Sequence, residues 1–139
     1  GGVPRVQDIL QAGLDLEAQN GQVDCQAMWS SYNVCRIVTN TGTFNGESKD
    51  QRHTAIAAMQ QRYNEILREE AAAYNSNSNG LNPNGIQVTA EYVNESTPTA
   101  GTFSFGSEHL NGGDCFHPNV MTQGLIAEML WNANPNKPQ

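Results

Sequence analysis

The stretch on which the predicted fold and function depend reads Gly-Gly-Asp-Cys-Phe-His-Pro-Asn at residues 112–119. Its acid precedes its histidine by three positions, so a loop can turn the carboxylate of Asp114 back onto the imidazole of His117. The acid then holds one ring nitrogen and leaves the other able to take a proton from a nucleophile. The same spacing also fits a surface Asp that caps a helix beside a solvated His. Pro118 suits a first helical position, so we expect a final helix over residues 118–132.

The residues around this motif carry a family resemblance. They are Phe103-Ser104-Phe105, Leu110-Asn111, Asp114-Cys115-Phe116-His117-Pro118-Asn119, Gly124 and residues 127–131. Together they resemble the C-terminal block of the SGNH (GDSL-type) esterases and lipases. The motif Asp-Cys-Phe-His is most similar to that of the phospholipase-B-like branch. The resemblance covers residues 103–135 and is thin elsewhere. It implies that Asp114 is the catalytic acid and His117 the base of a Ser-His-Asp ester hydrolase that needs no metal or other cofactor.

The resemblance also implies an α/β fold, with this chain forming the C-terminal part of a flavodoxin-like three-layer α/β/α SGNH hydrolase. The order of predicted elements is consistent with it: a helix over residues 48–74, a strand over residues 86–93, the Asp-His loop and the final helix. In open α/β sheets, ligands bind beyond the carboxyl ends of the strands. Asp114 and His117 follow the predicted strand, which is the expected place for a site.

Two predicted helices carry apolar side chains at three- and four-residue steps, which places them on one face. In the first, Ser48 and Gln51 have the spacing of a capping box. Its expected core face consists of Ala55, Ile56, Met59, Tyr63, Ile66, Leu67 and Ala71. The expected inward side chains of the final helix are Val120, Met121, Leu125, Met129 and Leu130.

The family's nucleophile motif, a Gly-Asp-Ser-Leu-like stretch, has no counterpart in this sequence. The nearest stretches, at residues 46–49 and 106–108, do not resemble it. We therefore interpret residues 1–139 as the C-terminal portion of one SGNH domain. Its expected partners are the N-terminal half with the serine, as a separate chain or missing segment, and a lipid or other acyl-ester substrate. The Val-Pro step at residues 3–4 is typical of the end of a central strand in that family.

The sequence has three cysteines, an odd number, and the expected location of the protein is secreted, periplasmic or extracellular. Cys25 and Cys35 bracket a short segment suited to one disulfide. That pairing leaves Cys115 as a buried small hydrophobe, a nucleophile, or a bridge to a chain segment outside residues 1–139.

Bulk composition excludes some classes of protein. The formal net charge of −7 argues against a nucleic acid or an anionic membrane surface as a partner. No stretch has the apolar length of a transmembrane segment. The length of 139 residues suits a single domain with a core.

Two other functions fit the same residues. His109, Asp114 and His117 supply three side chains of the kind that bind a catalytic metal and leave a position for water. Alternatively, the chain is a non-enzymatic acidic α/β scaffold or binding module, in which the Asp-His pair only fixes the last loop.

Overall fold

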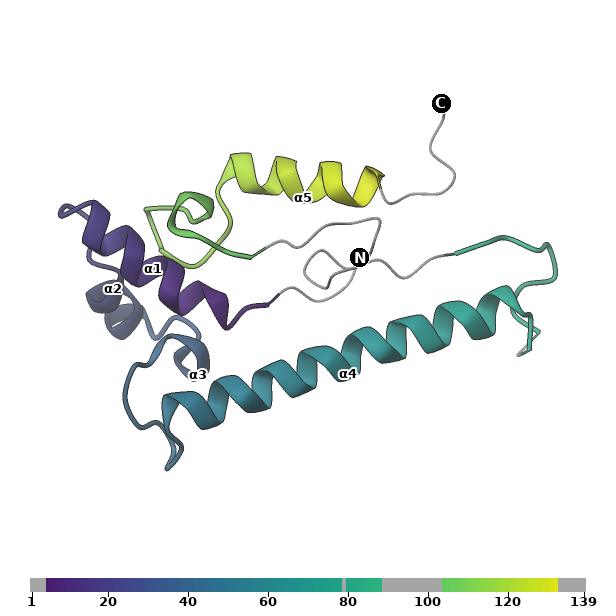
Figure 1. The fold of residues 1–139 in the computed structure, drawn as a ribbon, viewed down its shortest axis with the longest axis horizontal. Coiled ribbons are helices and arrows are strands. Elements are labelled where there is room, and N and C mark those ends of the chain that lie inside the picture. The colour runs from purple at the N-terminus through teal and green to yellow at the C-terminus, as the bar shows by residue number, and fades with distance from the viewer. Residues whose placement is uncertain (1–4, 79, 89–103, 133–139) are drawn as a thin grey trace.

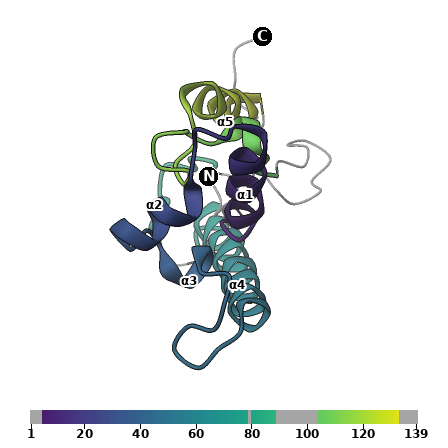
Figure 2. The same ribbon diagram turned by 90° about the vertical axis from the view of Figure 1, so that its left-hand side faces the viewer.

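The computed structural model describes residues 5–78, 80–88 and 104–132 of the chain. Its helices follow one another along the chain (Figure 1) as α1 (Asp8–Gln19), α2 (Cys25–Tyr32), α3 (Arg36–Thr39), α4 (Lys49–Asn75), the short 3-10 helix η1 (Ser107–His109) and α5 (Val120–Asn132). α1, α2 and α3 gather at the N-terminal end of α4, and the rest of α4 extends away from them. α5 lies on the other side of α1 from α4 (Figure 2).

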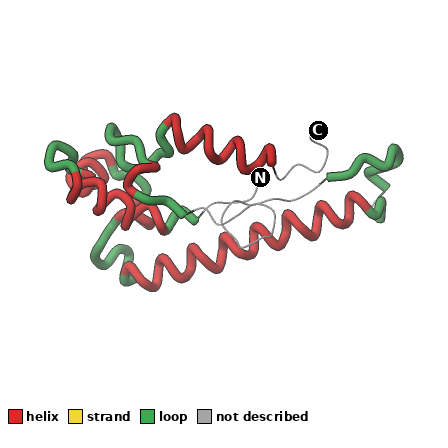
Figure 3. Tube along the Cα trace, turned by 45° about the horizontal axis from the view of Figure 1, so that its top comes forward, coloured by secondary structure: helices red, strands yellow, loops and turns green. Residues whose placement is uncertain are grey.

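The predicted α/β fold is wrong. Helices make up 60% of the described residues, and these contain no sheet, only isolated bridges between Phe44 and Glu47 and between Leu110 and Pro118. Figure 3 shows helices and loops without a strand in the described part of the chain. The three-layer flavodoxin-like arrangement of the SGNH hydrolases is therefore not the architecture of this chain.

Side-chain hydrogen bonds replace strand pairing where the strand over residues 86–93 was predicted. The Asn75 side chain accepts from the Val88 amide at 2.8 Å and donates to the Val88 carbonyl at 2.7 Å. Asn82 does the same for Ile86, with both distances 2.7 Å. These asparagine amides satisfy backbone groups that a neighbouring strand satisfies in a sheet. Residues 86–88 are consequently loop, and residues 89–93 of the predicted strand lie outside the described part.

The long helix predicted over residues 48–74 is confirmed as α4, and Ser48 and Gln51 form the capping box that their spacing indicated. The prediction that its apolar stripe lies in the core is wrong. Met59 is 57% exposed and Tyr63 53%, and Ile66 and Leu67 are also exposed. The buried side chains of α4 are instead Arg52, Gln60 and Asn64. α4 contacts α3 near its own start, and no sheet covers its apolar stripe.

The core consists of two adjoining clusters around α1. In the first, Ile9 and Ala12 pack with Phe105 and Leu110. In the second, Leu10 packs with Trp29 and with Cys25 and Cys115. α1 contacts both clusters because apolar residues occupy adjacent positions in its sequence, and adjacent positions point to different sides of a helix. Gly13 lies between the two buried faces.

The final helix is confirmed, although it begins at Val120 and not at Pro118. Only part of its inward face was predicted correctly. Met129 and Leu130 pack against the first core cluster, as expected. Val120, Met121 and Leu125 are exposed instead. None of the helices in the described part of the chain is long and apolar enough to cross a membrane.

Candidate active site: the Asp114–His117 loop

Backbone hydrogen bonds close residues 109–119 into a compact loop. The Asn111 amide donates to the His117 carbonyl at 2.9 Å, and the Asn111 carbonyl accepts from the Cys115 amide at 2.8 Å. The Asn119 amide donates to the His109 carbonyl at 2.9 Å. The two ends of the loop are therefore held side by side, and Asp114, Cys115 and Phe116 form its turn.

The loop brings the two predicted site residues together. Nδ1 of His117 lies 2.9 Å from Oδ2 of Asp114. Because a carboxylate only accepts, this contact places the ring proton on Nδ1 and leaves Nε2 as the acceptor. The side chain of His117 is 71% exposed and that of Asp114 is 36% exposed. The pair therefore has the orientation that the Asp-x-x-His spacing predicted.

The other oxygen of Asp114 is also occupied. Oδ1 accepts from the backbone amides of Phe116 and His117, both at 2.9 Å. Partial burial acts to raise the pKa of Asp114, but these two backbone hydrogen bonds and the hydrogen bond and charge of the His117 ring outweigh it. The pKa of the carboxyl is therefore lowered from its ordinary value, and Asp114 is ionised at neutral pH.

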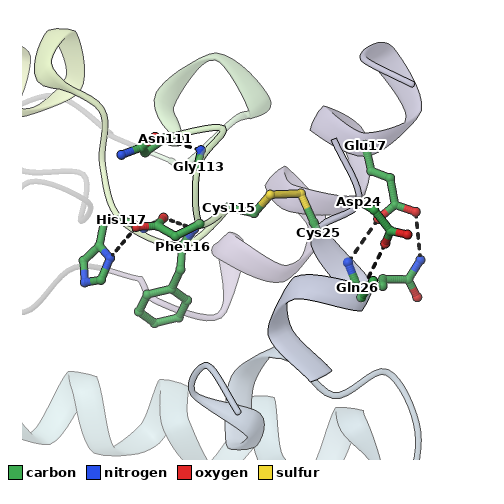
Figure 4. The surroundings of a disulfide bond; sticks show 11 residues. Glu17, Asp24, Cys25, Gln26, Asn111, Gly113, Cys115, Phe116 and His117 are labelled. Atoms are coloured by element: carbon green, nitrogen blue, oxygen red, sulfur yellow. Dashed lines mark hydrogen bonds and ion pairs between the residues drawn. A yellow bond between two sulfur atoms is a disulfide. The ribbon is translucent and has the colours of Figure 1, made fainter. Parts of the chain in front are cut away.

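A disulfide between Cys25 and Cys115 fixes the turn of the loop to the first residue of α2 (Figure 4). The predicted pairing of Cys25 with Cys35 is wrong, because Cys35 lies beyond the far end of α2 and is an exposed free thiol. The same bond excludes the interpretations of Cys115 as a nucleophile and as a bridge to a chain segment outside residues 1–139. The bridge also fixes a backbone that is unusual for its residue type, since Cys115 has φ of +54°.

Two side chains that sequence reasoning did not single out support the loop. The Asn119 amide nitrogen donates to the carbonyls of Glu108 and Leu110, and its oxygen caps α5 by accepting from the Thr122 amide at 2.9 Å. The Phe116 ring meets the His117 ring edge-on, with centroids 5.5 Å apart. The signal for Asn119 was present in the sequence, because Asn is a preferred residue immediately before a helix.

The proposed three-ligand metal site does not assemble. The described residues, which include His109, Asp114 and His117, contain no group of three side chains placed to hold a metal ion. Nδ1 of His109 instead accepts from the Gly106 amide at 2.8 Å, which turns that ring toward its own 3-10 helix. His109 is therefore part of the support for the loop.

The two serines of the nearest nucleophile-like stretches have structural roles. The Ser48 hydroxyl caps α4 by accepting from the Gln51 amide at 3.3 Å. Ser107 is buried, and its hydroxyl donates to the side chain of Gln19 at 3.2 Å. Neither hydroxyl hydrogen-bonds to His117.

No protein-family model, no curated protein and no solved structure matches this chain.

Proposed function

We propose that this chain supplies the acid and base of an ester hydrolase that works through a Ser-His-Asp triad. Asp114 is the acid, His117 the base, and the serine belongs to a separate chain or to a segment outside residues 1–139. The observation that carries the proposal is the 2.9 Å contact between Nδ1 of His117 and Oδ2 of Asp114, combined with the exposure of the ring. This contact leaves Nε2 as the proton acceptor on the exposed side chain.

The electrostatics of the pair support a role as a base. Asp114 is kept ionised by three hydrogen bonds, so a negative charge faces Nδ1 when His117 gains a proton at Nε2. The carboxylate stabilises the imidazolium and fixes the ring tautomer. A surface Asp that only caps a turn needs the two backbone hydrogen bonds and not the third.

In the proposed reaction, His117 Nε2 takes the proton from the serine hydroxyl as its oxygen attacks the ester carbonyl carbon. The tetrahedral intermediate then expels the alcohol, which receives that proton from His117. Water, activated by the same nitrogen, hydrolyses the acyl-serine and releases the acid and the free enzyme. We propose a lipid or other acyl ester as the substrate, on the resemblance of the Asp-Cys-Phe-His motif to the phospholipase-B-like branch.

The exposed apolar side chains of two helices support the requirement for a second polypeptide. On α4 these are Met59, Tyr63, Ile66 and Leu67, and on α5 they are Val120, Met121, Leu125 and Trp131. The four side chains on α4 lie on one face of the helix by their three- and four-residue spacing, and exposed apolar faces of this kind mark sites of protein–protein contact. The disulfide bears on the cellular location, because disulfides persist in oxidising compartments. We therefore propose that the protein is secreted or periplasmic.

The test is to purify the chain under native conditions from its source, with any associated polypeptide, and treat it with a fluorophosphonate probe that labels active serines. We expect a second polypeptide with the probe adduct and hydrolysis of an activated acyl ester. Asp114→Asn and His117→Gln should each lower kcat on the order of 10⁴-fold. His53→Gln is the matched control, since that ring contacts the Val38 carbonyl at 2.9 Å, and it should retain activity.

A second candidate function, a non-catalytic scaffold or binding module, is favoured by one observation. Asp114 Oδ1 accepts two backbone amides, which stabilises the turn whether or not His117 reacts. The scaffold alternative expects a single unlabelled 15.1 kDa species in the native sample, and Asp114→Asn should then change stability alone. That outcome would contradict the hydrolase proposal.

A further inference from the structure

One face of α4 has the residue spacing of a coiled coil. Its positions recur at alternating steps of three and four residues, and together they form the α4 seam: Ile56, Met59, Tyr63, Ile66, Glu70 and Ala73. Glu70 is the one charged residue among them. This spacing is typical of two helices that pack side by side along their length. A helix covered by its own domain usually carries a wider apolar stripe.

The rest of the described chain leaves the middle of the α4 seam open. Met59 is 57% exposed and Tyr63 is 53% exposed, and Ile66 is also exposed. α4 packs against α3 near its own start, and the remainder of the helix extends away from α1, α2 and α3 (Figure 1). A single exposed apolar residue is ordinary on a protein surface, but three successive positions of one seam favour contact with another helix.

The charges beside the α4 seam are complementary to those of a second copy. Arg62 lies along one flank, where it pairs with Glu65 at 3.3 Å and with Glu69 at 3.1 Å. When two copies of α4 run antiparallel, with Tyr63 of each opposite Ile66 of the other, Arg62 and Glu69 of different copies differ in level by about 3 Å along the axis. A two-fold axis makes this contact twice, so opposite charges meet on both sides of the centre.

The same residues oppose a parallel pair. In a parallel pair each seam position meets its own copy, which places the two Glu70 carboxylates against each other. In the antiparallel pair, Glu70 lies at the level of Met59 of the other copy, with Arg62 of that copy on the adjacent flank. Ile56 and Ala73 meet at the two ends, so a large side chain packs against a small one.

We propose that α4 packs antiparallel against α4 of a second copy of this chain, about a two-fold axis between Tyr63 and Ile66. The contact covers the exposed middle of the α4 seam. The proposal goes beyond the ester hydrolase, since it involves none of the residues of the Asp114–His117 loop. The exposed apolar side chains of α5, a helix that begins three residues after His117, remain available to a serine-bearing polypeptide.

Sedimentation equilibrium of the full chain, with its disulfide intact, measures the mass in solution. We expect a reversible dimer with twice the 15.1 kDa mass of the chain. A chain that is still monomeric at about 100 μM would overturn the proposal. A monomer that gains a probe-labelled serine from a second polypeptide would overturn the dimer and leave the ester hydrolase in place, so the two proposals fail separately.

Two matched variants locate the contact. Ile66→Glu places a carboxylate in the α4 seam and should weaken the dimer by about tenfold or more. Leu125→Glu makes the same change on α5, at 39% exposure against 36% for Ile66, and should change the dissociation constant less than about twofold. Circular dichroism reports whether each variant keeps its helices. Equal weakening by the two variants, or an unchanged dimer in folded Ile66→Glu, would contradict the proposal.

Two charge variants test the antiparallel alignment. Glu69→Arg gives a chain with positive charge at both flank positions, and Arg62→Glu gives a chain with negative charge at both. Each variant alone should dimerise more weakly than the wild type, and an equimolar mixture should favour the mixed dimer. Charge interactions within one helix are the same in every dimer and cannot produce this preference. Native mass spectrometry counts the three species, and random pairing would overturn the proposal.

Discussion

Cys25 and Cys115, which lie 90 positions apart in the sequence, are joined by a disulfide that ties the start of α2 to the turn holding Asp114 and His117. The bond closes a loop that contains most of the described chain, and both sulfurs are completely buried. It therefore links the stability of the fold to the geometry of the candidate active site.

Removing this bond should lower the free energy of unfolding by about 4 to 5 kcal/mol, because the closed loop is long. Urea denaturation of Cys25→Ser/Cys115→Ser is the measurement, in a Cys35→Ser background that prevents disulfide exchange. Cys35→Ser alone is the control and should change little. Although Cys35 is exposed as a residue, partial burial of its thiol raises the pKa of that thiol against an opposing hydrogen bond from the Val38 backbone, so little reactive thiolate forms at neutral pH. A loss below about 1 kcal/mol would contradict the prediction.

Asp114 should make the stability of the chain depend on pH in the acid range. Its pKa is lowered in the folded protein, so its contribution is present above the ordinary pKa of an Asp, about 3.9, and is lost as the pH falls through the folded pKa below that value. Urea denaturation of the wild type and of Asp114→Asn should therefore differ at pH 6 and converge near about pH 2. A difference that stays constant across this range would show that the carboxylate charge is not responsible.

Gly13→Ala should destabilise the chain by about 1 to 3 kcal/mol, although Ala is the better helix former. A Cβ at Gly13 would lie 2.4 Å from the Trp29 ring, so the ring or α1 must move. Gly124→Ala is a matched control on α5, because nothing lies within 4 Å of its Cβ position. The control should be neutral or stabilising by up to about 1 kcal/mol. Thermal unfolding of both variants gives the comparison, and equal effects would contradict the packing argument.

Arg52→Met should lower the free energy of unfolding by about 3 kcal/mol or more, because four carbonyl groups lose their donor. Arg52→Lys should also be destabilising, since an ammonium cannot reproduce the planar arrangement of guanidinium donors. Arg68→Met, a change of the same type on the exposed side of α4, is the control. Denaturant titration is the measurement, and a wild-type midpoint for Arg52→Lys would show that charge alone is sufficient.

The local geometry of the candidate site was predictable from the sequence, and the surrounding fold was not. An Asp three positions before a His needs only a tight turn to make the contact, and Asp114 and His117 make it. The fold prediction relied on a strand whose first three residues are loop, where Asn75 and Asn82 satisfy the backbone. A pattern of β-branched residues does not reveal side-chain partners of this kind.

The disulfide pairing is likewise a feature that the sequence did not predict. Cys25 and Cys35 are close in sequence, but α2 separates them, and the partner of Cys25 comes from the opposite end of the chain. Sequence spacing alone cannot decide connectivity when a helix intervenes.

The sequence by itself determined the elements that depend on near neighbours: the capping box and length of α4, the helix α5, and the hydrogen bond between Asp114 and His117. Only the tertiary structure decided which helical faces are buried and which cysteines pair. The physical reason is the distance along the sequence between the residues that interact, because the hydrogen bonds of a cap or a turn form within a few residues of the chain. Burial depends on which distant segment arrives to cover a face, and on α4 that choice placed Arg52 inside and Met59 and Tyr63 outside.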